Sequence, residues 1–236
     1  MVKREKGFTL VELIIVLVIL AVLAALLVPA LLGYIDKAKD EKDLAFAQSA
    51  LTAVQGGLTE QYAIYGGSLK PGKKEENLIV PSKEQNGATA SGDVNATAAT
   101  TYPNEFATRI LKLIDQKDQK NTTTNNNNDP VVVMFGVGSN LAGSTCTIYE
   151  KYTVYYLMYQ QTVDSTPHFY FNGYWTTTNP LTDKTQFSDR HTPIVGPLAG
   201  KKMQFYVISN KLSEKLGQGT IRACDDKFWK HVDSFK

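Results

Sequence analysis

Hydrophobic positions divide the first 65 residues of the chain into two different segments. Residues 13–35 contain no charged side chain and consist mainly of Leu, Val, Ile and Ala. About 20 apolar residues in an α-helix cross the core of a bilayer, so this run is long enough to span a membrane. We predict a hydrophobic helix over residues 8–33. A kink or a melted turn is expected near residues 25–29, because Pro29 lacks a backbone donor and clashes with the preceding turn.

Residues 34–65 continue as a predicted amphipathic helix, in which apolar side chains recur at steps of three and four. The face expected to pack on a sheet contains Leu44, Ala47, Leu51, Val54, Leu58, Tyr62 and Tyr65. A second stripe of smaller residues lies roughly opposite and contains Ile35, Ala38, Ala45, Phe46, Ser49 and Ala53. This stripe indicates either packing between helices in an assembly or a core helix with incidental alanines. Gly66-Gly67 predicts the end of the helix.

The rest of the chain divides into a linker region and a β-rich head. Residues 66–129 are mostly polar, with a strand candidate at 78–80 and a short helix near 104–117. One side of that helix is predicted to carry Phe106, Ile110, Leu113 and Ile114. Residues 130–236 hold strand candidates at 131–135, 147–162, 168–171, 174–177, 203–209 and 220–224. Asn172-Gly173 is a strong signal for a two-residue hairpin.

These patterns predict an α+β fold. A long N-terminal α-helix, membrane-spanning before assembly, packs by its second half on a C-terminal antiparallel sheet of four to six strands.

Charge and cysteine content narrow the picture. Among 236 residues there are 25 Lys and Arg and 23 Asp and Glu. Residues 1–7 hold three of the basic and one of the acidic residues, so the remainder has 22 of each and is formally neutral. Neutrality argues against a partner that is strongly anionic and fits close self-association. The two cysteines, Cys146 and Cys224, suit an exported protein with one disulfide; two unpaired buried thiols are the alternative.

Glu12 is the unusual residue of the apolar block. A carboxylate at membrane depth costs about 3 kcal/mol, so it is by default functional and needs a partner. Cleavage after Gly7 would give Phe8 a new α-amino group, with Glu12 one helical turn further along. That ammonium and the carboxylate could pair within one chain or between neighbours, where a buried pair would also fix register. Basic residues in 3–6 would hold the leader on the cytoplasmic side.

At these residues the chain resembles type IV prepilins and type IV pilin-like proteins: a basic leader at residues 1–7, then Gly-Phe-Thr-Leu-Val-Glu at 7–12, then an uninterrupted apolar helix. The resemblance covers residues 1–60. It implies cleavage after Gly7 by a prepilin peptidase, N-methylation of Phe8, and assembly through Glu12 and Pro29 into a homo-oligomeric helical filament. An inner-membrane assembly platform is an implied partner. The implied location is the cytoplasmic membrane first and the cell surface afterwards.

Several alternatives stay open beside a pilus subunit. A pseudopilin of a type II secretion or competence pseudopilus would carry the same segment. A minor pilin with an adhesive or DNA-binding head would explain the tyrosine-rich strands and the eight basic against four acidic residues of 201–236. An ordinary signal peptide has a shorter apolar region, and a plain membrane anchor does not explain Glu12.

The sequence indicates a structural protein and not an enzyme, and no cofactor is expected. The segment 196–202 is one residue short of a phosphate-binding loop and lacks its Ser or Thr. His168, His191 and His231 lack paired ligand spacing, so no metal site is predicted. Asp225-Asp226 could ligate calcium, but a solvated turn is the simpler interpretation.

Overall fold

The computed structural model describes residues 9–65, 110–111, 113–114, 130–139, 144–212, 216 and 226–235. The chain forms two compact units, Met1–Lys42 and Asp43–Lys236, and one helix, α1 (Leu10–Tyr65), runs through both. The helix ends at the predicted residue, directly before Gly66-Gly67.

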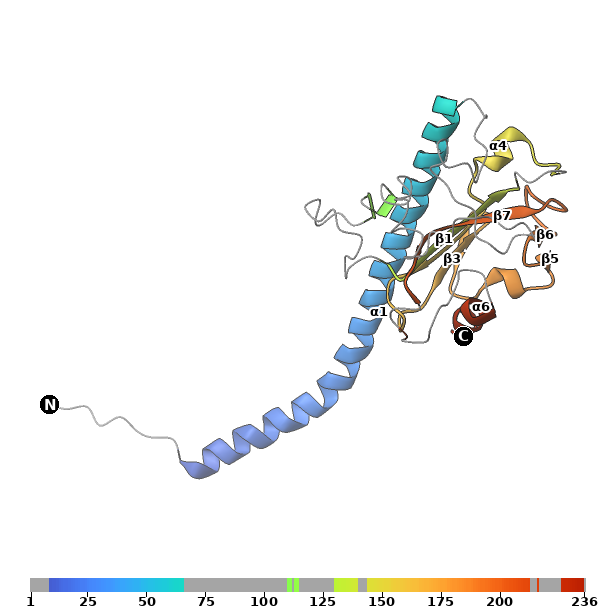
Figure 1. The fold of residues 1–236 in the computed structure, drawn as a ribbon. Helices are drawn as coiled ribbons and strands as arrows, with labels where there is room; N and C mark the ends of the chain where they lie inside the picture. Colours follow the sequence, from blue (N-terminus) through green and yellow to red (C-terminus); the bar gives the residue numbers. More distant parts are fainter. Residues whose placement is uncertain are drawn as a thin grey trace. The chain divides into compact units, whose positions relative to one another are not determined.

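The first unit is an exposed apolar helix. All side chains described in residues 10–42 lie exposed, and the helix is long and apolar enough to cross a membrane. The melted turn expected near Pro29 is absent: the helical backbone continues through this residue, and the blue part of the ribbon curves without a break (Figure 1). Leu and Ala on both sides have high helix propensity, so the helix tolerates the loss of one hydrogen bond as a bend.

The second unit is built on a five-stranded antiparallel sheet. The strand order is β4-β3-β2-β1-β7, with β1 in contact with both β2 and β7. The strands are β1 (Val132–Gly138), β2 (Tyr156–Gln160), β3 (His168–Phe171), β4 (Tyr174–Thr176) and β7 (Met203–Asn210). A separate pair consists of β5 (Phe187–Asp189) and β6 (Thr192–Pro193), preceded by the 3-10 turn η1 (Pro180–Thr182). The predicted α+β fold is confirmed.

The hairpin between β3 and β4 forms at the predicted dipeptide. Asn172 has φ 50° and Gly173 has φ 91°, and Phe171 pairs with Tyr174 directly across the turn. A two-residue turn with positive φ at both positions matches the right-handed twist of the strands, which explains why Asn-Gly occupies it.

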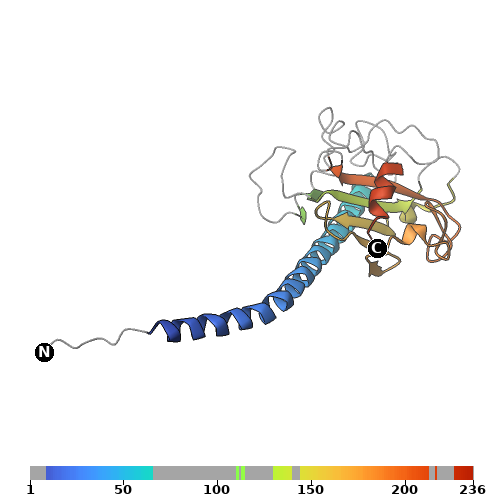
Figure 2. The same ribbon diagram turned by 90° about the horizontal axis from the view of Figure 1, so that it is seen from below.

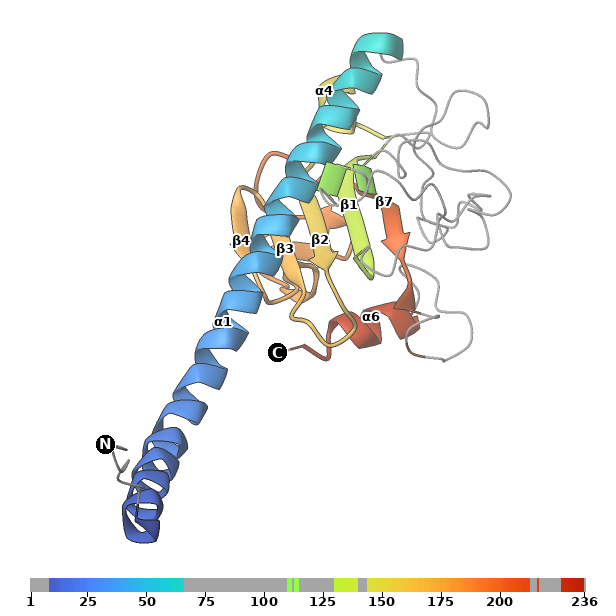
Figure 3. The same cartoon turned by 90° about the vertical axis from the view of Figure 1, so that its left-hand side faces the viewer.

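One face of the sheet packs on the second half of α1 (Figure 3). Alternation along β1 sends Val133, Phe135 and Val137 to this side. The fully buried apolar residues of the helix are Ala47, Ala50, Val54 and Leu58.

The buried stripe of α1 is therefore rotated from the predicted one. Ala50 and Gln61 are buried, whereas Leu44, Leu51 and Tyr62 are only half-buried. Phe46 and Ala53, placed by the sequence on the opposite stripe, pack against the same core. Only part of that second stripe, including Ala45, faces away from the head.

The other face of the sheet is covered by the C-terminal helix α6 (Asp226–Val232) and by the loops around β5 and β6 (Figure 2). Phe228 and Val232 of α6 pack on this core together with Phe187 and Leu198. Helix α6 was not predicted from the sequence.

A second short helix, α4 (Ile148–Lys151), also corrects a prediction, because the strand expected over 147–162 begins only at Tyr156. Thr147 and Glu150 form a capping box that starts the helix: each side chain accepts a hydrogen bond from the other residue's backbone N–H. The motif is local and outweighs the β-propensity of the surrounding Tyr and Val residues.

Other predictions lie partly or wholly outside the described residues. The strand candidates at 78–80 and 220–224 are outside, as is most of the helix expected near 104–117. Of the residues predicted on one side of that helix, Ile110 and Ile114 are buried and Leu113 is exposed.

Candidate processing and assembly site

The start of α1 is organised by Thr9 and Glu12. The Thr9 backbone N–H donates to Glu12 Oε2 at 2.9 Å, and the Thr9 hydroxyl donates to the same oxygen at 2.7 Å. The Glu12 backbone N–H donates in return to Thr9 Oγ1 at 3.3 Å. These contacts form a capping box, which satisfies backbone donors that the first turn of a helix leaves unpaired.

This geometry gives Glu12 a partner that the sequence analysis did not consider. Oε2 is occupied by Thr9 of the same chain, while Oε1 accepts no hydrogen bond from a described residue. The signal was present in the sequence, because Thr-x-x-Glu at 9–12 is the standard capping-box pattern.

The other predicted site residues lie apart from this turn. Gly7 and Phe8 lie outside the described residues, so pairing between Glu12 and the Phe8 ammonium stays a prediction. Pro29 is an exposed helical residue about 26 Å further along α1, at about 1.5 Å per residue. The structure therefore does not bring Pro29 and Glu12 together.

The structure does not show the predicted disulfide between Cys146 and Cys224. Cys146 is buried and is a free cysteine, and its thiol donates to the Lys202 carbonyl at 3.6 Å. Cys224 lies outside the described residues. The disulfide stays a prediction, which alkylation of the unfolded, non-reduced protein would check.

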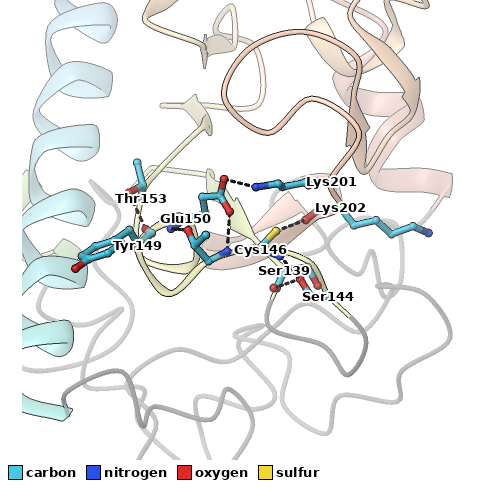
Figure 4. Close-up of polar contacts among 9 residues, drawn as sticks. Ser139, Ser144, Cys146, Tyr149, Glu150, Thr153, Lys201 and Lys202 are labelled. Atoms are coloured by element: carbon cyan, nitrogen blue, oxygen red, sulfur yellow. Dashed lines mark hydrogen bonds and ion pairs between the residues drawn. The ribbon is translucent and has the colours of Figure 1, made fainter.

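A polar cluster surrounds Cys146 where α4 meets the start of β7 (Figure 4). Lys201 Nζ lies 2.6 Å from Glu150 Oε1, and Glu150 Oε2 accepts from the Thr147 backbone N–H at 2.7 Å. The Lys201 hydrogen bond lowers the pKa of Glu150, and the same bond raises the pKa of Lys201. The cluster joins α4 to the loop before β7 by an ion pair and hydrogen bonds, an arrangement that stabilises the fold.

The histidines do not form a common site. His168 lies on β3, His191 follows β5, and His231 lies in α6. Burial lowers the pKa of both His191 and His231, and His231 Nε2 lies 3.2 Å from Gln160 Oε1. Within the part of the chain that the structure describes, no group of three or more His, Cys, Asp or Glu residues could hold a metal ion.

Comparison with known proteins agrees with the N-terminal geometry. Residues 2–28 match the family described as the prokaryotic N-terminal methylation motif. The motif is that of a prepilin, and the long helix with an antiparallel sheet is an α+β fold like that of type IV pilin-like proteins.

The chain is similar in part to the type II secretion system core protein G of three bacteria. It is 46% identical to the protein of Klebsiella pneumoniae over 56 residues, which cover 24% of this chain and 37% of the relative. It is 34% identical to the protein of Dickeya chrysanthemi over 106 residues, which cover 44% and 59%. The match to the protein of Pectobacterium carotovorum subsp. carotovorum is 49% over 51 residues, covering 20% and 33%.

The chain therefore spans between about a third and three fifths of the length of these relatives. No solved structure matches the chain. The apolar helix and the prepilin motif imply that the precursor is inserted in the inner membrane before assembly.

Proposed function

We propose that this protein is a pseudopilin, a structural subunit that is cleaved after Gly7 and assembled through α1 into a type II secretion-like pseudopilus. The observation that carries the proposal is the exposed apolar surface of residues 10–35, which nothing in the described chain covers. Apolar surface of this extent needs lipid before assembly and neighbouring helices afterwards. The relatives, all core protein G, favour a pseudopilus over the surface pilus first expected from the sequence.

In the proposed pathway, cleavage after Gly7 creates the positive charge that pairs with Glu12 during assembly. Hydrolysis of the Gly7–Phe8 peptide bond leaves a carboxylate on Gly7 and an ammonium on Phe8. Thr9 holds Glu12 Oε2, so Oε1 is the oxygen open to the ammonium of a neighbouring subunit. Pairing there neutralises two charges at membrane depth and sets the axial register of the incoming subunit.

The processing step is tested at Gly7. Gly7→Asp should abolish cleavage and leave the precursor in the membrane, because a charged, larger side chain replaces the small residue before the cut. Gly7→Ala is the control and should retain cleavage. The readout is the N-terminal mass of the chain, expected to begin at Phe8 in wild type. A normally cleaved Gly7→Asp chain would contradict the peptidase assignment.

The assembly step is tested at Glu12. Glu12→Gln keeps size and an acceptor for Thr9 but removes the charge, so cleavage and head folding should persist while incorporation into fibres falls. Thr9→Ser, which keeps the capping hydroxyl, is the matched control. Wild-type incorporation of Glu12→Gln would exclude Glu12 as the assembly charge, and accumulation of its precursor would assign it to peptidase recognition instead.

Recovery of the fibres separates the two kinds of assembly. A pseudopilus subunit should remain with the cell envelope after shearing, whereas a pilus subunit should dominate the sheared surface fraction. Mass spectrometry of both fractions identifies which of them holds the chain that begins at Phe8. An adhesive or DNA-binding role of the head stays a prediction.

A further inference from the structure

Exposed apolar side chains of the head gather around the turn between β3 and β4. Tyr174 is 78% exposed, Ile194 49% and Val195 41%. They are three of the five large apolar residues that lie exposed in the described part of residues 43–236. The loop is held to the turn, because Asn172 Nδ2 donates to the Val195 carbonyl at 3.5 Å. We call Tyr174, Ile194 and Val195 the edge patch.

Strand β4 beside this patch is an outer edge of the sheet and has an unpaired backbone (Figure 3). The two-residue turn makes Phe171 and Tyr174 a hydrogen-bonded pair, so the backbone N–H and C=O of Trp175 point away from β3. The alternation agrees on the other side of β3, where the Asn172 N–H donates to the Tyr155 carbonyl at 3.4 Å. No described residue hydrogen-bonds to the two backbone groups of Trp175.

This edge is fixed in place but carries no guarding charge. The Trp175 ring lies 5.5 Å from that of Tyr170 and packs on the core beneath α1, which holds the strand rigidly. Edge strands are commonly protected by charged side chains or proline, and β4 has neither. Residues 172–179 and 192–200 contain no charged side chain at all. The protection that remains is the short length of β4, which limits pairing to a few hydrogen bonds.

We propose that β4 and the edge patch bind an extended, uncharged segment of an exported protein, which adds to the sheet as a further strand. The backbone groups of Trp175 recognise any extended chain, while the edge patch contacts the apolar side chains that alternate along it. The inference rests on the proposed function, because a secretion-type pseudopilus brings the head close to exported proteins. Few hydrogen bonds and a small patch suit brief, reversible binding.

A second copy of the chain is a poorer occupant of this edge. Antiparallel pairing of β4 with β4 needs a two-fold axis normal to the sheet. Because the second half of α1 packs flat on the sheet, that axis would make the two helices run in opposite directions. One membrane or one fibre requires them to run the same way.

The rest of the sheet supports the same conclusion. The opposite edge strand, β7, offers no free partner for β4, since its residues 203–209 are all buried. A stable interface between proteins also takes about 20 residues from each side, many more than β4 and the edge patch supply.

The binding test uses the purified, full-length, cleaved chain in detergent and a fluorescein-labelled peptide of alternating threonine and valine. Fluorescence anisotropy measures Kd. N-methylation of the central peptide residues removes backbone donors and should weaken binding about tenfold. Tyr174→Lys places a guarding charge on the edge and should also weaken binding about tenfold. Tyr149→Lys, the same change at a tyrosine 69% exposed on α4, is the control and should change Kd by less than about twofold.

A second variant guards against an indirect effect of Tyr174→Lys. Ile194→Lys changes the edge patch from the neighbouring loop and should weaken binding by about three- to tenfold. Tryptophan fluorescence shows that each variant is folded.

Crosslinking in cells tests the source of the bound segment. A photoreactive benzophenone amino acid replaces Tyr174 in one strain and Tyr149 in the control strain, and mass spectrometry identifies the crosslinked peptides. Segments of exported proteins should be crosslinked from position 174 and not from position 149. Crosslinks from position 174 to this chain itself would show that a second copy occupies the edge and would overturn the proposal.

The remaining outcomes separate this inference from the proposed function. Equal binding of the plain and N-methylated peptides, undiminished binding by the lysine variants, or no binding by wild type would each overturn the inference alone, because cleavage and fibre recovery are measured separately. A chain that dominates the sheared surface fraction would overturn the proposed function. Exported proteins would then be excluded as the source, even where the peptide binds.

Discussion

The two halves of α1 both carry leucine and alanine side chains but differ in what covers those side chains. Leu23, in the first half, is 50% exposed, whereas Leu58, in the second half, is fully buried against the sheet. The second half finds its cover within its own chain. The first half does not, so its burial has to come from lipid or from other copies.

This difference separates folding from assembly. A buried leucine contributes about 2 to 3 kcal/mol relative to an exposed one. In the second half that contribution stabilises the isolated head, while in the first half it appears only when the helix enters a membrane or a fibre. Substitutions in the two halves should therefore damage different properties.

The largest expected effect on the head comes from Leu58→Ala. Removing a fully buried leucine should lower the free energy of unfolding by about 3 kcal/mol, through lost transfer energy and a cavity between α1 and the sheet. Leu23→Ala is the same change in the first half and should leave that free energy unchanged. Both tryptophans, Trp175 and Trp229, lie in the head, so their fluorescence during denaturation in detergent reports on head unfolding alone.

An equal loss in the free energy of unfolding in Leu58→Ala and Leu23→Ala would contradict the conclusion that only the second half of α1 stabilises the head. An unchanged Leu58→Ala protein would show that the described packing of α1 on the sheet is wrong.

A smaller change in the free energy of unfolding is expected when alanine replaces a glycine at the packed end of a strand or on the exposed side of α1. A Cβ added at Gly138, at the end of β1, would lie 2.8 Å from the Glu150 carbonyl oxygen, so Gly138→Ala should lower the free energy of unfolding by about 2 kcal/mol. A Cβ at Gly56, on the exposed side of α1, meets nothing within 4 Å. Gly56→Ala should raise the free energy by about 1 kcal/mol, because alanine is the better helix former.

Denaturation of a soluble fragment that begins at Tyr34 would measure both changes. We expect the free energy of unfolding to fall in Gly138→Ala and to rise in Gly56→Ala. A stabilising Gly138→Ala would mean that α4 does not approach β1 as closely as described.

The fold was predictable where a local signal and the tertiary structure agree. The apolar run, the three-and-four periodicity and Asn172-Gly173 each specify an element by themselves, and all three were predicted correctly. Helix α6 was missed because its seven residues are too few to show a period, and it is held by packing on the sheet.

The candidate site was predictable only in part. Glu12 stands out by its cost in an apolar run, whereas Thr9 matters through a reciprocal hydrogen bond that becomes visible only with the helix start in place. The same Thr-x-x-Glu pattern at Thr147 was missed for the same reason, hidden in a segment rich in β-forming residues.

The smallest predicted effect concerns Glu150 and compares a partly buried ion pair in the head with an exposed one on the first half of α1. The Glu150 side chain is 15% exposed and lies 2.6 Å from Lys201, whereas Glu41 is 70% exposed and lies 4.0 Å from Lys37. Glu150→Gln should lower the free energy of unfolding of the same fragment by about 1 kcal/mol at pH 7. Glu41→Gln should leave it unchanged.

The pH dependence identifies the charge as the cause. The folded state lowers the pKa of Glu150, so the carboxylate stabilises the fold above its unfolded pKa of about 4.3, and this contribution is lost as the pH falls through the folded pKa. The pKa of Lys201 is raised, so its contribution is lost only as the pH rises through its folded pKa in the alkaline range. The difference between wild type and Glu150→Gln should therefore be constant from about pH 6 to 8 and shrink toward pH 3. A difference that does not diminish as the pH falls below the unfolded pKa of about 4.3 would show that the charge of Glu150 is not the cause of the loss.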